Sequence, residues 1–144
     1  MNDRKPWPQY FIEMATLVAS RSEDLSTHVG CVIVGPDHEV RSTGYNGFPR
    51  GVEATPERLE RPAKYAWTAH AEINAVGNAA RSGVSLKGCT AYVTHAPCDD
   101  CTRLLIQSGI TEVVYGGGAA AMSIGSDISL LMFAEAGVNV RLQP

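Results

Sequence analysis

Near the start of the chain, hydrophobic residues recur with the period of an amphipathic helix. Within Pro8–Ser20, the apolar positions at i, i+3, i+4 and i+7 are Phe11, Met14, Ala15 and Val18. This spacing places them on one face of a helix. The segment therefore predicts a helix that packs against the rest of the fold through that face.

Two short segments rich in β-branched residues follow the expected helix. They are His28–Val34 and Val40–Tyr45, and the residues between them begin with the turn signal Gly35-Pro36-Asp37. We expect the two segments to pair as a β-hairpin. The next residues, Gly47–Thr68, are rich in proline and charge and show no clean period. They predict a long surface loop, and loops of this length in small domains are usually functional or mobile.

The second half of the chain alternates between helical and strand patterns. The expected helices are Ala69–Arg81, Pro97–Gln107 and Ile128–Ala136, and the expected strands are Cys89–Thr94, Glu112–Tyr115 and Val138–Leu142. Strands that alternate with helices pair in parallel through right-handed crossovers. Together with the antiparallel hairpin, this order predicts a three-layer α/β/α domain with a mixed five-stranded sheet.

The composition is that of a globular protein. Apolar residues make up 44% and charged residues 19% of the 144 positions, which fits one domain over residues 1–144. The sequence has no apolar leader and no run of 18 apolar residues, so we expect a cytoplasmic protein without a membrane partner. A formal charge of −3 disfavours a long nucleic acid as partner, because such binding draws on clustered Lys and Arg. A small anion such as a mononucleotide needs only a few local cations.

Two short motifs carry the candidate chemistry. They are His70-Ala71-Glu72 and Pro97-Cys98-Asp99-Asp100-Cys101, each at the start of an expected helix. Cys98 and Cys101 are three residues apart, so they share one helix face at the positive helix end, which favours thiolates. With a neutral His70 as third ligand, a tetrahedral zinc keeps its fourth position open for water, as catalytic zinc sites do. The combination H-x-E and P-C-x-x-C is the signature of zinc-dependent nucleobase deaminases.

Glu72 is the candidate acid–base residue beside this metal. It follows His70 by two residues, which on a regular helix separates the side chains by about 200° around the axis. The two side chains can converge only if His70 lies at the helix cap or in a distorted first turn. The motif therefore predicts that the start of this helix is not regular at His70.

Other interpretations of these residues remain open. The Cys98–Cys101 pair could be a redox pair, or the zinc could be structural with His95 as a fourth ligand. The other two cysteines, Cys31 and Cys89, lie in apolar contexts and are expected to be core thiols.

Over roughly residues 8–142, the chain resembles the deoxycytidylate deaminase family of the cytidine deaminase superfamily. The segments that carry the resemblance are Arg21–Asp24, His28–Gly30, Gly44–Pro49, Lys64–Tyr65, His70–Ala75, Pro97–Cys101 and Ile106–Ile110. The resemblance implies zinc-dependent hydrolysis of a deoxycytidine monophosphate to the deoxyuridine monophosphate and ammonia. It also implies a homo-oligomer, commonly a hexamer in this family.

The resemblance assigns roles to individual residues. The implied zinc ligands are His70, Cys98 and Cys101, and Glu72 is the implied proton carrier. The implied substrate contacts are Asn46 for the sugar, Ala71 and Tyr115 near the base, and a phosphate cation among Arg21, Arg50, Lys64 and Arg81. Family members with a second, structural zinc bind it through Cys or His before the histidine ligand. Residues 47–69 here contain neither, so one zinc per chain is expected.

The chain departs from the family beside the base. After Tyr115 the family usually places an aromatic residue, whereas this chain has Gly116–Ala121. A pocket enlarged in this way would accept a deoxycytidylate substituted at position 5 of the base. The alternative is that Phe48, Tyr65 or Trp67 fills the space.

Rival functions come from other classes. One is deamination of another nucleotide, of a nucleoside, or of a base within RNA or single-stranded DNA, as tRNA adenosine deaminases do. Another is a non-catalytic zinc module. Glu72 argues against the module, because a purely structural site has no use for a carboxylate beside the metal.

Overall fold

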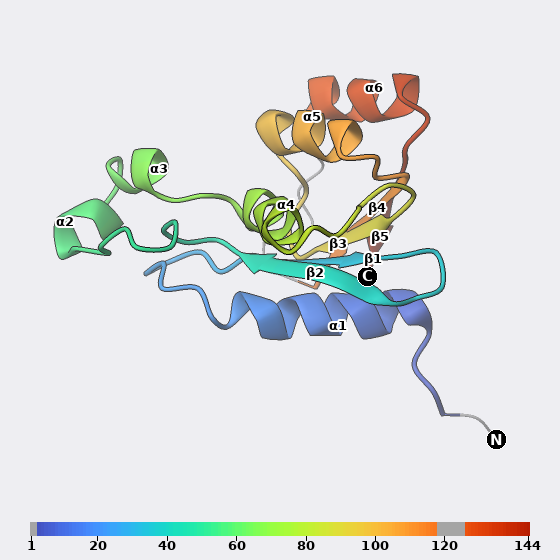
Figure 1. Cartoon of the computed structure of the whole chain (residues 1–144), viewed down its shortest axis with the longest axis horizontal. Coiled ribbons are helices and arrows are strands. Elements are labelled where there is room, and N and C mark those ends of the chain that lie inside the picture. Colours follow the sequence, from blue (N-terminus) through green and yellow to red (C-terminus); the bar gives the residue numbers. More distant parts are fainter. Residues whose placement is uncertain (1–2, 118–125) are drawn as a thin grey trace.

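The computed structural model describes residues 3–117 and 126–144 as a mixed sheet with helices on both faces (Figure 1). In chain order the elements are α1 (Trp7–Ala19), β1 (Gly30–Val34), β2 (Val40–Tyr45), α2 (Pro56–Leu59), α3 (Lys64–Trp67), α4 (Ala71–Ser82), β3 (Thr90–Val93), α5 (Asp99–Gln107), β4 (Glu112–Gly116), α6 (Asp127–Glu135) and β5 (Asn139–Gln143). Within the described ranges, none of the helices has both the length and the apolar character needed to cross a membrane.

The strand order of the five-stranded sheet is β2-β1-β3-β4-β5. Strand β1 pairs antiparallel with both β2 and β3, whereas β3, β4 and β5 pair in parallel. The predicted hairpin and the predicted parallel half are therefore both confirmed. The carboxyl ends of β3 and β4 lie side by side, and α5 begins shortly after the end of β3.

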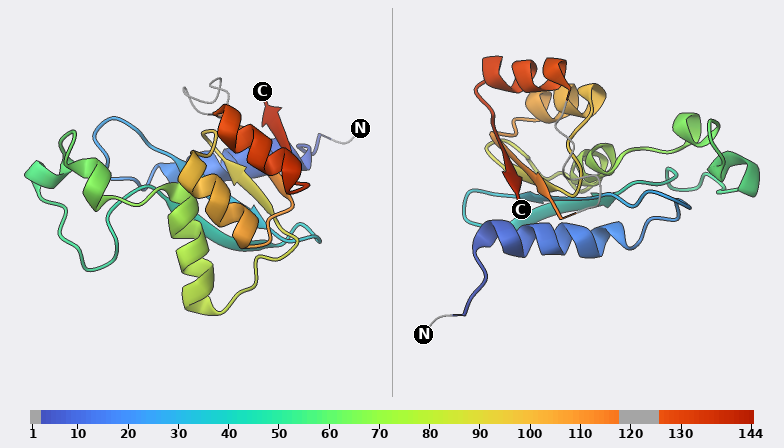
Figure 2. Two further views of the ribbon diagram at one scale, coloured as in Figure 1. Left: turned by 90° about the horizontal axis from the view of Figure 1, so that it is seen from above. Right: turned by 180° about the vertical axis from the view of Figure 1, so that it is seen from behind.

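The helices form two outer layers. Helix α1 covers one face of the sheet, and α4, α5 and α6 cover the other (Figure 2). A hydrophobic cluster lies on each face of the sheet, and successive residues of β1 point into different clusters. Val32 packs in the cluster under α1, and Ile33 packs in the cluster under α4. Cys31 and Cys89 are fully buried free thiols in that second cluster, as expected. The predicted three-layer architecture is confirmed.

Two glycines allow the helices to approach the sheet closely. A Cβ placed on Gly30 would lie 1.9 Å from the carbonyl oxygen of Ala15 in α1. A Cβ placed on Gly44 would lie 2.3 Å from the backbone nitrogen of Ala75 in α4. Because both neighbours are backbone atoms, only glycine fits without moving a helix. The contact at Gly44 fixes the position of α4, whose N-terminal end carries the H-x-E motif.

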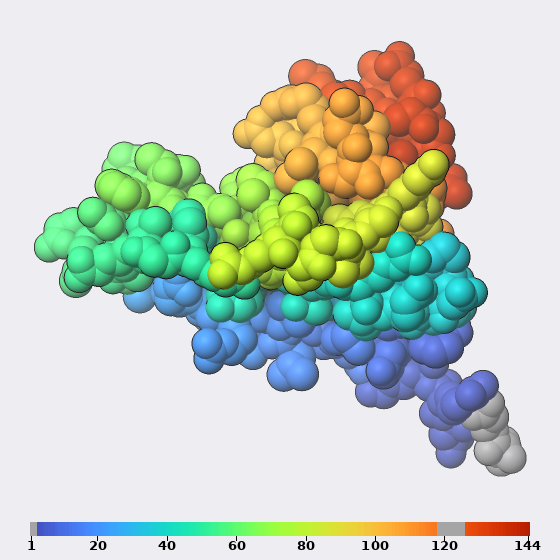
Figure 3. All heavy atoms as spheres, in the orientation of Figure 1, coloured from blue at the N-terminus to red at the C-terminus, as the bar shows by residue number. Residues whose placement is uncertain are grey.

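The expected long loop is irregular over most of its length, as predicted, but it also contains helices that the sequence did not indicate. Within it the chain forms the single-turn helices α2 and α3, and residues 48–68 extend away from the body as an arm (Figures 1 and 3). Pro56 occupies the first turn of α2, and the side chain of Thr55 accepts a hydrogen bond from the backbone N–H of Arg58. A single turn is too short to show a hydrophobic period, so the sequence pattern could not reveal these helices.

Candidate active site

The two chemical motifs lie at helix caps. His70 is the N-cap of α4, with φ −67° and ψ 159°, and Cys98 is the N-cap of α5, with φ −73° and ψ 174°. Both residues have extended backbone dihedral angles, so their side chains point in directions that differ from those of residues within the helix. The sequence predicted that His70 lies either at the helix cap or in a distorted first turn, and the structure places it at the cap. Both helices consequently begin two residues later than the sequence pattern predicted.

The caps bring three potential metal ligands together. The Nδ1 atom of His70 lies 3.4 Å from the Sγ atoms of both Cys98 and Cys101. All three ligand atoms lie within 4.8 Å of one another. Tetrahedral zinc with ordinary bond lengths holds nitrogen and sulfur ligands about 3.6 Å apart. The side chains present therefore fit one zinc ion.

The start of α5 positions the Cys98 side chain. The backbone N–H of Cys101 donates to the Sγ atom of Cys98 at 3.5 Å, so the thiol occupies the N-cap position of the helix. Burial, together with the nearby Glu72 and Cys98, raises the pKa of the Cys101 thiol well above its usual range. A coordinated metal ion deprotonates such a thiol, so metal binding by this cluster releases protons.

Glu72 lies in the first turn of α4 and is only 4% exposed. It lines the same cavity as His70 and Cys98. Burial raises the pKa of the Glu72 carboxyl, although its own backbone N–H and His70 partly oppose the rise. A carboxyl with a raised pKa exchanges protons more readily near neutral pH than an exposed one does.

His95 does not complete a four-ligand site. Its Nδ1 atom donates to the carbonyl oxygen of Ala96 at 2.9 Å. Among the described residues, the group of possible metal ligands contains His70, Cys98 and Cys101 and omits His95. The geometry therefore favours an open, three-ligand metal site over a closed structural one or a redox pair.

The cavity beside these ligands has a volume of about 220 Å³. The residues predicted from sequence that line it are Asn46, Lys64, His70, Ala71, Glu72 and Cys98. Tyr65 and His95, which the sequence suggested as a filler of the space beside the base and as a fourth zinc ligand, line it too. The lining residues that sequence reasoning did not assign are Asp24, Thr27, Val29, Arg61, Thr68 and Ala96. No motif or period in the sequence marked Arg61, because the folding of the arm brings it to the cavity.

Asn46 is held in a fixed orientation at the cavity wall. Its Oδ1 atom accepts from the backbone N–H of Val29 at 2.8 Å, and its Nδ2 atom donates to the carbonyl oxygen of Thr27 at 2.8 Å. An asparagine amide has two N–H donors and two acceptor lone pairs. These two contacts leave one donor and one lone pair for a ligand.

Four of the predicted substrate contacts lie outside the cavity lining. Arg50 lines a separate hollow, where its guanidinium donates to the Oδ1 atom of Asn78 at 2.7 Å. Arg21 and Arg81 are exposed, and Tyr115 is buried at the end of β4. None of these four residues lines the space beside Glu72.

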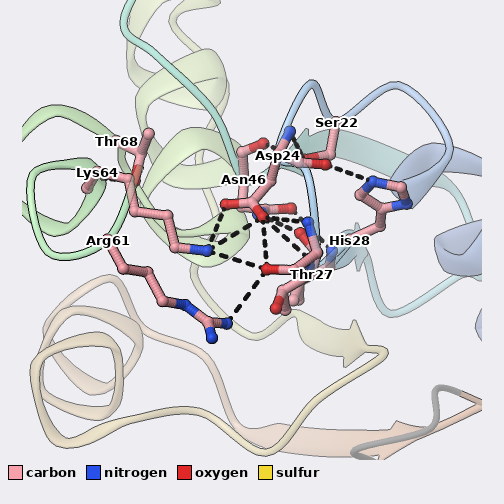
Figure 4. Close-up of polar contacts among 10 residues, drawn as sticks. Ser22, Asp24, Thr27, His28, Asn46, Arg61, Lys64 and Thr68 are labelled. Atoms are coloured by element: carbon pink, nitrogen blue, oxygen red, sulfur yellow. Dashed lines mark hydrogen bonds and ion pairs between the residues drawn. The ribbon is translucent and has the colours of Figure 1, made fainter. Parts of the chain in front are cut away.

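Lys64 reaches the cavity but is already paired. Its Nζ atom lies 3.0 and 3.1 Å from the two carboxylate oxygens of Asp24 and 3.3 Å from the Oγ atom of Ser26 (Figure 4). Both charged side chains are 7% exposed. Lys64, one of the four cations named for the phosphate, therefore reaches the cavity with its charge neutralised by a buried carboxylate.

The expected enlargement beside the base falls on Ala119–Ala121, which lies outside the described residues. Of the aromatic side chains named as alternatives, Tyr65 lines the cavity. Phe48 lines the separate hollow of Arg50. Trp67 packs under the guanidinium of Arg58, whose Cζ atom lies 3.9 Å from the ring centroid.

An open three-ligand zinc site and a buried glutamate at two helix caps of a mixed sheet define a class, the zinc-dependent nucleobase deaminases. Residues 5–117 match the family model described as the cytidine and deoxycytidylate deaminase zinc-binding region. The chain belongs to this family. The resemblance inferred from the sequence is thereby confirmed.

Individual relatives agree with this assignment. The chain is 37% identical to deoxycytidylate deaminase of Mus musculus over 146 residues, covering 97% of this chain and 81% of the relative. It is 36% identical to deoxycytidylate deaminase of Homo sapiens over the same share of both chains. The crystal structure of dCMP deaminase from the cyanophage S-TIM5 in complex with dCMP and dUMP is 25% identical, with a TM-score of 0.77, covering 97% of this chain and 99% of that chain.

Proposed function

We propose that this chain hydrolyses deoxycytidylate to deoxyuridylate and ammonia with the help of one zinc ion. The observation that carries the proposal is the convergence of three ligand atoms within 4.8 Å at the wall of a cavity that also holds the Glu72 carboxyl. The family membership and the deoxycytidylate deaminases among the relatives support the substrate.

His70, Cys98 and Cys101 are the residues that would hold the zinc. When bound, zinc supplies a Lewis acid that lowers the pKa of a water molecule towards neutrality. The open arrangement of three protein ligands is the one that catalytic zinc sites use.

Glu72 moves the protons of the reaction. It accepts a proton from the attacking water and delivers it to the ring nitrogen beside the reacting carbon. The water oxygen bonds to that carbon, and the bond from the carbon to the exocyclic amino group breaks. Glu72 carries the second proton of the water to the amino group, which leaves as ammonia. Its burial keeps bulk water away from these transfers.

Backbone and side-chain donors near Glu72 would orient the substrate. Ala71 is the first residue of α4 and lines the cavity, and the first N–H groups of a helix have no partner within the helix. We assign the N–H groups of Ala71 and Cys98 to the base and the amide of Asn46 to the sugar.

The wider setting is proposed from the family resemblance. We propose a single deaminase domain over residues 1–144 that acts in the cytoplasm as a homo-oligomer, with a hexamer as the expected form. Helix α6 supports an interface, because Ile128 and Leu131 are 61% and 59% exposed while Phe133 of the same helix is buried. Light scattering at micromolar concentration that gives the mass of one chain would contradict the oligomer.

A substrate panel tests the proposed activity. Ammonia release is measured with deoxycytidylate, its 5-methyl analogue, deoxycytidine, cytidine, guanine nucleotides and a cytosine-containing single-stranded oligonucleotide. The expected result is the highest kcat/KM for deoxycytidylate or its 5-methyl analogue. A higher kcat/KM for a nucleoside, a guanine nucleotide or the oligonucleotide would contradict the proposal.

A further inference from the structure

The cavity beside Glu72 has two cationic side chains among its described lining residues, Arg61 and Lys64. They differ in what they contact. Lys64 is buried and ion-paired, whereas Arg61 is exposed. Neither takes part in the proton transfers assigned to Glu72.

The positive charge of Lys64 is neutralised by the carboxylate of Asp24. Burial by itself raises the pKa of the Asp24 carboxyl, but the backbone N–H groups of Ser26 and Thr27 and the ammonium of Lys64 outweigh it and lower the pKa to about 2. Asp24 is therefore ionised at neutral pH, and the pair of Asp24 and Lys64 adds no net charge to the cavity.

Arg61 lines the same cavity, and among the described residues no carboxylate forms an ion pair with it. Its guanidinium donates to the Oγ atom of Ser26 at 3.1 Å, a hydroxyl rather than a carboxylate. A guanidinium has five N–H donors in a planar fork that suits phosphate oxygens, and the contact to Ser26 occupies one of them. Because the pair of Asp24 and Lys64 adds no net charge, Arg61 is the cation of the described cavity lining whose charge is available to attract an anion.

The buried ion pair also places Arg61. The backbone N–H of Lys64 donates to the carbonyl oxygen of Glu60 at 2.8 Å, so the turn that contains Arg61 is closed next to the anchored lysine. Lys64 attaches this turn to the body through Asp24. Arg61 is consequently carried by a fixed turn at the cavity, although it belongs to the projecting arm.

Other arginines of the same part of the chain are engaged elsewhere. Arg58 lies over the ring of Trp67 and donates to the carbonyl oxygen of Glu53 at 2.9 Å. Arg50 donates to Asn78 in its own hollow. They provide matched controls, because each can lose its charge without changing the cavity.

We propose that Arg61 binds the phosphate of the substrate, so that the cavity takes a nucleoside 5′-monophosphate and discriminates against the nucleoside. This inference rests on the proposed function and names the residue that selects its substrate class. Lys64 acts as a positioning residue for Arg61 and leaves the phosphate to it.

Equilibrium binding of the reaction products tests the proposal without turnover. Calorimetry measures the Kd of deoxyuridylate and of deoxyuridine for the zinc-loaded wild type and the variants Arg61→Gln, Arg61→Lys and Arg58→Gln. Arg61→Gln is expected to weaken deoxyuridylate about 10- to 100-fold and to leave deoxyuridine unchanged, as for the loss of charge-assisted hydrogen bonds. Arg61→Lys should fall between wild type and Arg61→Gln, and Arg58→Gln should equal wild type.

Three outcomes would overturn the phosphate assignment. They are an unchanged ratio of nucleotide to nucleoside affinity in Arg61→Gln, an equal loss for both ligands, and a wild type that binds both ligands equally well. Ammonia release from deoxycytidine and deoxycytidylate by the wild type is measured separately. A protein that deaminates both equally well refutes the role of Arg61 but keeps the deaminase, whereas one that deaminates neither refutes the proposed function.

Discussion

Replacing Lys64 by methionine tests the buried ion pair that attaches the arm to the body. Methionine keeps an unbranched apolar side chain in the space of the lysine stem and removes only the ammonium. Asp24, which is 8% exposed, then keeps its negative charge without a cation at 3.0 Å. Breaking a buried ion pair by removing one partner costs about 3–5 kcal/mol.

The carboxyl itself gives a second measure of this interaction. Its pKa falls from the usual 3.8 to about 2, which at about 1.4 kcal/mol per pKa unit corresponds to about 2.5 kcal/mol of folding free energy. The N–H groups of Ser26 and Thr27 supply part of that amount, and they remain in the variant. Removing the ammonium also leaves the Asp24 charge buried without a partner, so we expect Lys64→Met to lower the free energy of unfolding by about 3 kcal/mol at pH 7, the lower end of the range for a broken pair.

Urea unfolding of the zinc-loaded protein at one fixed protein concentration measures the loss. The matched control is Lys87→Met, an exposed lysine, for which a change within about 0.5 kcal/mol is expected. The double variant Asp24→Asn with Lys64→Met should regain part of the loss, because no charge is then left unpaired. A loss below about 1 kcal/mol in Lys64→Met would refute the reasoning.

The effect also has a defined pH dependence. Because the folded-state pKa of Asp24 lies below its usual 3.8, its stabilisation is fully present above that pH and is lost as the pH falls towards about 2. The difference between wild type and Lys64→Met should therefore be constant from neutral pH to slightly above 4 and shrink below that. A difference that grows on acidification would contradict the ion pair as its source.

Three further changes have expected outcomes. Cys98→Ser should abolish zinc binding and activity together, measured by metal analysis beside ammonia release, and full zinc occupancy would contradict the ligand assignment. Glu72→Ala should retain one zinc per chain and the fold but lose about 10²- to 10⁴-fold in kcat, since that is the usual contribution of general acid–base catalysis. Gly44→Ala should lower the thermal unfolding temperature or prevent folding, because the added Cβ would lie 2.3 Å from the backbone nitrogen of Ala75; an unchanged Tm would show that α4 can move away.

Much of the fold could be predicted because local patterns and tertiary structure agree. The strand hairpin and the helix before it appear in the hydrophobic spacing, and Gly83, Gly109 and Gly137 follow helices with positive φ angles, as helix-ending glycines do. The metal ligands could be predicted for a similar reason. Cys98 and Cys101 are close in sequence, and the geometry of a helix cap requires the placement observed for His70.

The arm and the substrate side of the cavity could not be predicted in the same way. Asp24 and Lys64 are 40 residues apart, and nothing local distinguishes a lysine that will be buried beside a carboxylate from one that faces solvent. The single-turn helices α2 and α3 have no period of their own. The role of Arg61 depends on both features, so it emerges only from the folded arm.

The central claim is hydrolytic deamination of deoxycytidylate, and isotope incorporation tests it most directly. The zinc-loaded protein is incubated with deoxycytidylate in ¹⁸O-labelled water, and mass spectrometry of the nucleotide is combined with an ammonia assay. The account predicts deoxyuridylate carrying one ¹⁸O atom at the deaminated ring carbon and one ammonia for each nucleotide converted. Unchanged deoxycytidylate, or a product without the label, would contradict it.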